Sequence, residues 1–77
     1  MIEADQVWDA GDLGCGHLLI ELRRRLRAMP GCILHLVALD PGAVEDIPSY
    51  CRITRNELVR MEPASHSFFI RSRLDWT

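Results

Sequence analysis

The residue in this sequence that is best suited to chemistry is Cys15, which lies in the run Leu13-Gly14-Cys15-Gly16-His17. A segment with helical spacing begins directly after it, so the thiol should lie at the N-terminus of a helix. Unpaired backbone N–H groups and the helix dipole favour negative charge there, and we therefore expect the thiolate form. The thiolate is the form of cysteine that acts as a nucleophile or carries a transferred group. We predict that Cys15 is the functional residue.

Two neighbours of the thiol, Gly16 and His17, are candidates for modulating it. A histidine two residues after Cys15 could stabilise the thiolate or move a proton. A solvated side chain is the alternative, which we favour slightly because a cation is unfavourable at a helix N-terminus. Cys15 could also be a small apolar turn residue, although the flanking glycines favour exposure. No metal or other cofactor is expected, because Cys15 and His17 lack the paired spacing of structural zinc ligands.

The other two cysteines are interpreted as core residues. Cys32 lies in an apolar run, and Cys51 falls on the inner face of a predicted helix. A disulfide between Cys15 and Cys51 stays open as an alternative. An odd number of cysteines fits free thiols in a reducing compartment better than a disulfide framework.

Every basic side chain other than histidine is an arginine, and four of the nine form the cluster Arg23, Arg24, Arg25 and Arg27. We expect this cluster to lie close to Cys15 and predict that Arg23, Arg24 and Arg27 help to dock an acidic partner. A solvated helix face is the alternative. The cluster alone is too short to indicate phosphate or RNA binding.

The composition is typical of a small globular domain. The 77 residues leave room for one domain, expected over 1–77 with a core at about 5–72. The formal net charge of −2 does not indicate direct binding to nucleic acid. No apolar run approaches the ~20 residues that span a bilayer, and the acidic N-terminus does not resemble a secretory signal. We therefore expect a cytoplasmic protein, as a monomer or a weak dimer.

The first half of the chain predicts a strand, a helix and a second strand. Residues 6–10 form a short strand candidate, and 16–29 carry an apolar stripe with helical spacing that Pro30 and Gly31 end. Residues 32–39 are almost continuously apolar, which favours a buried strand. Alternation places Cys32, Leu34, Leu36 and Ala38 on one face and Ile33, His35 and Val37 on the other.

The second half predicts a helix and a hairpin. The helix lies within 43–54, and its start is ambiguous because Pro48 is too far in for an unbroken helix from Ala43. A looser turn followed by Asp46 as N-cap would reconcile the two signals. Residues 57–62 and 67–72 form two strands joined by a short connection, hence an antiparallel hairpin. The tail 73–77 has no clear assignment. The order β-α-β-α-β-β implies a two-layer α/β sandwich, in which two helices cover one face of a mixed four-stranded sheet. The other face would leave Ile33, Val37 and Val59 exposed.

A family resemblance rests mainly on the run Asp40-Pro41-Gly42-Ala43-Val44-Glu45-Asp46-Ile47-Pro48-Ser49-Tyr50-Cys51. Together with Cys15, the basic segment after it, Pro30-Gly31 and Glu57-Leu58, this run resembles the TusA/SirA family of small sulfur carrier proteins. The resemblance covers about residues 7–72 and implies the same two-layer α/β sandwich.

The resemblance implies a carrier that holds a persulfide on Cys15. Members of the family accept sulfur from a cysteine desulfurase and pass it to an acceptor in tRNA thiolation, molybdenum cofactor synthesis or sulfur oxidation. Whether this chain also acts as a sulfurtransferase enzyme stays open.

The chain departs from the family's Cys-Pro-x-Pro motif, because Gly16 and Leu18 stand at the two proline positions. Prolines fix the first turn of a helix and glycine loosens it, so Cys15 should be presented less rigidly. Two alternatives to the carrier therefore stay open. One is a non-catalytic regulatory or interaction module of the same fold, and the other is a thiol redox protein with Cys51 as the resolving cysteine.

Overall fold

The computed structural model describes residues 3–76, which form a four-stranded sheet covered on one face by two helices. The elements follow in the order β1 (Gln6–Gly11), α1 (Cys15–Arg27), β2 (Ile33–Ala38), α2 (Ala43–Thr54), β3 (Glu57–Glu62) and β4 (Ser67–Arg71). A single turn of 3-10 helix, Pro63–Ser65, joins β3 to β4. The predicted fold class is confirmed.

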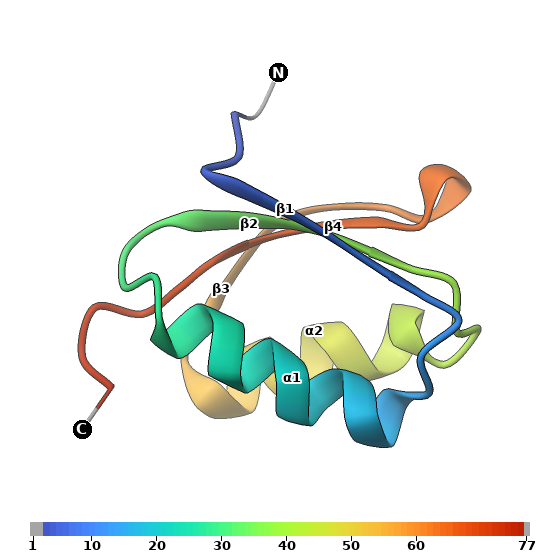
Figure 1. Ribbon diagram of the computed structural model, residues 1–77, viewed down its shortest axis with the longest axis horizontal. Coiled ribbons are helices and arrows are strands. Elements are labelled where there is room, and N and C mark those ends of the chain that lie inside the picture. Colours follow the sequence, from blue (N-terminus) through green and yellow to red (C-terminus); the bar gives the residue numbers. More distant parts are fainter. Residues whose placement is uncertain (1–2, 77) are drawn as a thin grey trace.

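The strand order in the sheet is β1-β2-β4-β3. β1 pairs with β2 in parallel, whereas β4 runs antiparallel to both of its neighbours, β2 and β3. α1 and α2 lie side by side beneath the sheet (Figure 1). Because β1 and β2 are parallel and each is followed by a helix, α1 and α2 both begin at the same edge of the sheet.

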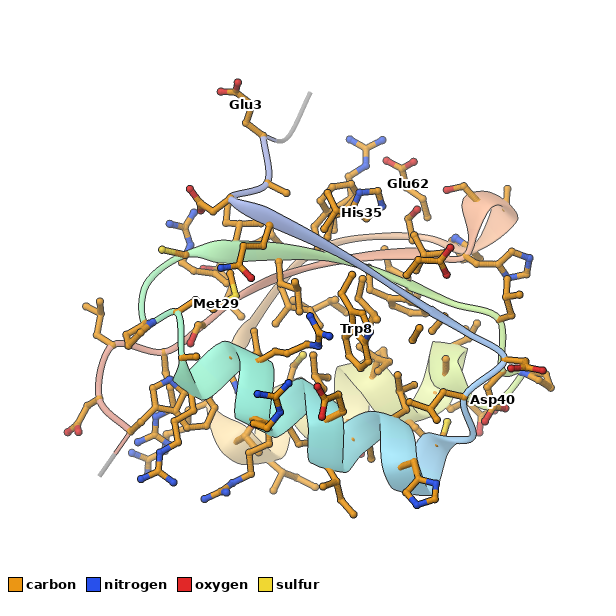
Figure 2. All side chains as sticks on the ribbon, in the orientation of Figure 1. Glu3, Trp8, Met29, His35, Asp40 and Glu62 are labelled. Carbon is orange, nitrogen blue, oxygen red and sulfur yellow. The ribbon has the colours of Figure 1, made fainter. Side chains whose placement is uncertain are left out.

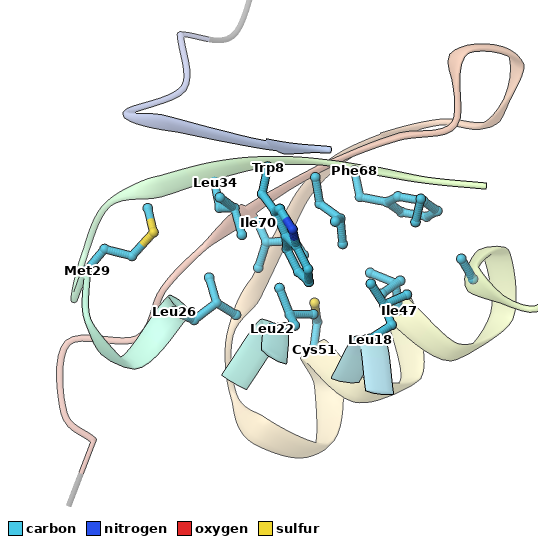
Figure 3. Packing of buried hydrophobic residues seen from close by; sticks show 13 residues of the cluster. Trp8, Leu18, Leu22, Leu26, Met29, Leu34, Ile47, Cys51, Phe68 and Ile70 are labelled. Atoms are coloured by element: carbon cyan, nitrogen blue, oxygen red, sulfur yellow. The ribbon is translucent and has the colours of Figure 1, made fainter. Parts of the chain in front are cut away.

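The core lies between the sheet and the two helices (Figure 3). The alternation predicted for β2 is confirmed, since Leu34, Leu36 and Ala38 are buried. Both helices contribute a buried stripe spaced by three or four residues. The buried apolar residues are Trp8, Leu18, Leu22, Leu26, Met29, Leu34, Leu36, Ala38, Ala43, Ile47, Cys51, Phe68 and Ile70.

The start of α2 differs from the prediction, because the helix begins at Ala43 with Gly42 as N-cap and not after Asp46. Pro48 is the sixth helical residue, so its missing N–H removes one backbone hydrogen bond from the helix. Ala43, Ile47 and Cys51 are buried on both sides of the proline. Their burial offsets the cost of about 3 kcal/mol that an interior proline imposes.

The uncovered face of the sheet is partly shielded by its own side chains. Ile33, Val37 and Val59 are half-buried there, and Val7 is the most open, with 67% of its surface exposed. The His35 ring stacks on Phe69 with 4.3 Å between the ring centroids. Ile33, Val37 and Val59, which were expected to be exposed on this face, are therefore only partly exposed.

The tail after β4, for which no structure was predicted, packs against the end of α1 (Figure 1). The Ser72 hydroxyl donates to the Leu26 carbonyl at 2.6 Å and accepts the Trp76 indole N–H at 2.9 Å. The Arg73 backbone N–H donates to Asn56 Oδ1 at 2.8 Å. These bonds fix the tail over the C-terminus of α1.

Candidate functional site

Cys15 is the first residue of α1, as the sequence predicted. The N-cap residue Gly14 has no side chain to cap the helix, and a carboxylate from another part of the chain takes that role. The Cys15 backbone N–H donates to Asp40 Oδ2 at 2.9 Å. Asp40 Oδ1 accepts the N–H of Gly42, the N-cap residue of α2, also at 2.9 Å. One carboxylate therefore fixes the beginnings of both helices, and Figure 2 shows Asp40 at that end of the molecule.

The Cys15 thiol lies among carboxylates that meet around Gly42. A methyl group placed on Gly42 would lie 3.7 Å from Cys15 Sγ, 3.5 Å from Asp40 Oδ1 and 3.4 Å from Asp46 Oδ2. The thiol is hydrogen-bonded to the side chains of Asp46 and Asp40. Bonds from the N–H of Gly42 and from the thiol and N–H of Cys15 hold the pKa of Asp40 below its usual value. Asp40 is therefore ionised and acts as an acceptor.

This environment keeps Cys15 protonated at neutral pH. Burial, then the hydrogen bonds to Asp46 and Asp40 and their negative charges, raise the pKa of Cys15 from 9.0 to about 12. A helix N-terminus stabilises a negative charge by only about 0.3–1 kcal/mol, whereas one pKa unit corresponds to about 1.4 kcal/mol. The expectation of a thiolate is wrong, because burial and the two carboxylates together outweigh the helix dipole.

The thiol is half-buried and opens onto the surface. A hollow of about 400 Å³ is lined by Gly14, Cys15, Gly16, His17 and Ile20. A second hollow of about 420 Å³ shares His17 and Ile20 with the first and continues to Leu13, Trp8 and Arg25. We name the two together the Cys15 groove. Ile20 is 71% exposed in this groove, so the surface that leads to the thiol is apolar.

The far part of the Cys15 groove is lined by Trp8, Glu21 and Arg25, which contact one another. The Arg25 guanidinium lies over the Trp8 ring, 4.5 Å from its centroid, and its Nε lies 3.1 Å from Glu21 Oε1. Arg25 is therefore held against the indole.

The structure places the predicted site residues in two separate regions. Gly16 and His17 line the Cys15 groove beside the thiol. The exposed Arg23, Arg24 and Arg27 lie farther along α1, with Arg23 and Arg27 about 12 and 18 Å from Cys15 at a rise of about 1.5 Å per residue. The expectation that these arginines lie close to Cys15 is wrong. The charged groups next to the thiol are acidic.

Asp40 and Asp46 are the residues of this site that the sequence reasoning missed. A signal for them was present, because parallel strands place the residues that follow them at one edge of a sheet. Asp40 comes two residues after the end of β2, and Cys15 follows β1 by a short turn. The predicted β-α-β unit thus already brought the two together.

The remaining features concern metal, redox and membrane chemistry. All three cysteines are free, and Cys51 is 2% exposed in the core, where burial raises its pKa to about 12. Between residues 3 and 76, no three side chains of the types that bind metals are grouped to hold an ion. Within the same range, neither helix is long and apolar enough to cross a membrane.

Comparisons with known proteins identify the family of the chain. A model of the family described as Sulfurtransferase TusA matches residues 6–72. The sulfur carrier protein TusA of Allochromatium vinosum is 35% identical over 69 residues, which cover 88% of this chain and 91% of that protein. The proteins of that name from Pseudomonas paraeruginosa and Pseudomonas putida GB-1 are 32% and 31% identical over 74 residues, and these cover 92% of this chain. The chain therefore belongs to the TusA family of sulfur carrier proteins.

Proposed function

We propose that this chain carries sulfur as a persulfide on Cys15, accepts it from a cysteine desulfurase and passes it to an acceptor protein. The observation that carries the proposal is the position of Cys15 as the first residue of α1, at the end of an open apolar groove. A partner's persulfide could reach the thiol through this groove. The acceptors implied by the family belong to tRNA thiolation, molybdenum cofactor synthesis or sulfur oxidation.

The transfer step exchanges one S–S bond for another. Cys15 Sγ attacks the outer sulfur of a persulfide on the donor's cysteine, the donor's S–S bond breaks, and the donor's sulfur leaves with the electron pair. The Cys15 proton passes through the carboxylate of Asp46 or Asp40 to the leaving sulfur. A thiol and a persulfide enter and a thiol and a persulfide leave, so no oxidant is needed.

Because the pKa of Cys15 is raised, we propose that the docked donor helps to activate the thiol. In the free protein Cys15 is a hydrogen-bonded thiol and a poor nucleophile. A donor that brings positive charge to Asp40 and Asp46 would weaken their effect on the thiol and lower its pKa. Sulfur transfer is then restricted to the docked complex.

The arginines of α1 are proposed as a second contact with the donor. Arg23 and Arg27 are exposed, and Arg24 is held by Glu21 through Nε at 3.0 Å. Because these charges lie away from the thiol, they would steer association without changing the chemistry of Cys15.

The test is the intact mass of the protein after incubation with a cysteine desulfurase and cysteine. We expect the wild type to gain the mass of one sulfur atom, which a thiol reductant removes. Cys15→Ser should gain nothing, and Cys32→Ser is the matched control that should load normally. Equal loading of Cys15→Ser and the wild type would end the proposal.

Two observations favour a second candidate function, a non-catalytic interaction module of the same fold. The thiol is held protonated, and Gly16 and Leu18 stand where the family has prolines. A wild-type protein that binds a desulfurase without gaining sulfur would establish this alternative. The redox alternative is disfavoured, because Cys51 is almost fully buried in the core.

A further inference from the structure

A hollow separate from the Cys15 groove lies at the opposite end of the molecule, and three of its seven lining residues are arginines. It has a volume of about 310 Å³ and is formed where β4, the tail and the C-terminus of α2 meet. Its charged lining residues are Arg55, Arg71, Arg73 and Glu57. Three positive charges and one negative charge leave a formal +2, although the whole chain carries −2. We name this hollow the arginine pocket.

The walls of the arginine pocket are fixed by buried hydrogen bonds. Ser72 is 2% exposed and is bonded to Leu26, and the buried Asn56 accepts the N–H of Arg73. The exposed Leu74 lies against Gly31 at the pocket, where a Cβ atom would lie only 2.7 Å from Leu74 Cδ2. Gly31 also has a φ of 77°, which glycine adopts most readily. The pocket is therefore part of the packed structure.

Two of the three guanidinium groups have contacts within the protein, and that of Arg73 also lies over the Trp76 ring, 5.5 Å from its centroid. Arg73 Nη1 donates to the Thr54 carbonyl at 3.1 Å, and Arg71 Nε lies 3.3 Å from Glu57 Oε1. A guanidinium has five N–H donors, so each of these contacts leaves others for a ligand. The guanidinium fork matches the oxygen geometry of phosphate groups.

Arg55 is the third arginine that lines the pocket. It ends α2 with a φ of 64°, in the left-handed region where glycine or asparagine is usual. A side chain with a Cβ atom is strained at this position. Glycine would relieve this strain and would also remove one positive charge from the pocket.

We propose that the arginine pocket binds a diphosphate group. Three guanidinium groups, two from the end of β4 and the tail and one from the residue after α2, can engage more oxygens than one carboxylate or one phosphate presents. The volume lies at the lower end of the range for small-ligand sites, about 300–1,000 Å³, which suits a small anion. The proposal does not depend on sulfur carriage, because the pocket and Cys15 lie at opposite ends of α1.

The test is titration with inorganic pyrophosphate at low salt, followed by calorimetry and by the backbone amide resonances of Arg55 and Ser72. We expect saturable binding that Arg55→Gly and Arg71→Gln each weaken by about tenfold or more. Glycine suits the backbone at position 55, so Arg55→Gly tests the charge without unfolding the helix end. Arg60→Gln, which removes the same charge from a strand position outside the pocket, should bind within about twofold of the wild type.

Two results would overturn the proposal. One is the absence of pyrophosphate binding by the wild type. The other is equal weakening by Arg60→Gln and Arg55→Gly, which would indicate attraction to net charge and not a site. Sulfur loading of Cys15 should be the same in Arg55→Gly as in the wild type, so failure of the pocket and failure of the carrier proposal are distinguishable.

Discussion

Charged side chains of opposite sign gather at the two ends of α1. At the N-terminus, where a helix favours an anion, Asp40 occupies that position and Asp46 lies beside the thiol. At the other end, nitrogen-tipped side chains gather beyond the helix (Figure 2), and Arg55, Arg71 and Arg73 line a pocket. The chain has nearly equal numbers of acidic and basic side chains. The chemistry of each end therefore depends on which of these side chains the fold brings together there.

A helix N-terminus does not by itself activate a cysteine. The helix dipole is a partial charge, and in this protein an ionised carboxylate already satisfies it. A second anion on Cys15 would face Asp40 and Asp46 at close range. The thiol therefore needs a partner to become reactive.

The largest effect is expected from removing the carboxylate that fixes both helices. Asp40→Ala deletes the acceptor for the N–H groups of Cys15 and Gly42. Each lost cap costs about 0.5–2 kcal/mol, so the free energy of unfolding in urea should fall by about 1–4 kcal/mol. Asp12→Ala, which removes an exposed carboxylate from the turn before α1, should change it by less than about 0.5 kcal/mol. Similar losses of unfolding free energy in both variants would show that Asp40 does not stabilise the beginnings of the two helices.

The second effect is on the reactivity of the thiol. Asp40→Asn with Asp46→Asn keeps polar side chains of similar shape but removes both negative charges, so the pKa of Cys15 should fall. A fall of one unit raises the thiolate fraction about tenfold, and we expect at least this increase in the alkylation rate near pH 8. Cys15→Ser identifies the reacting thiol. An unchanged rate would show that the carboxylates do not control the thiol.

The third prediction concerns the opposite end of the molecule, where a substitution should raise the free energy of unfolding instead of lowering it. Arg55→Gly relieves a left-handed backbone position and should raise the free energy of unfolding by about 0.5–1 kcal/mol. Arg52→Gly is the control, because it puts glycine inside α2 and should lower the same quantity by about 1 kcal/mol. Equal destabilisation by both would contradict the strain assigned to Arg55.

The smallest effect is expected at the α1 arginines. The double variant Arg23→Gln, Arg27→Gln should slow association with the desulfurase by about two- to fivefold and reduce its dependence on salt. Its alkylation rate in the absence of the desulfurase should match the wild type. Stopped-flow association measured at two salt concentrations checks this, and a changed alkylation rate would place the arginines in the chemistry instead.

Most of the fold could be predicted from the sequence because its signals are local. The alternation in β2 and the stripe on α1 depend on residues a few positions apart, and Leu34, Leu36, Leu22 and Leu26 are buried as expected. The start of α2 was missed because burial around Pro48 outweighs the local preference against an interior proline.

The chemistry of the site was harder to predict because it depends on distant residues. Asp40 is 25 positions from Cys15, and its effect on the thiol appears only when β1 and β2 pair. The arginine pocket combines positions from 31 to 74 for the same reason. Local patterns found the cysteine and the helix start but not the charges that surround them.

The most direct test of this account is the titration of the Cys15 Cβ resonance by NMR in the free wild-type protein. We expect the shift of a protonated thiol throughout the neutral range, with the midpoint well above 9.0 and near 12. A midpoint below 9.0, with thiolate already present at neutral pH, would contradict the role assigned to Asp40 and Asp46.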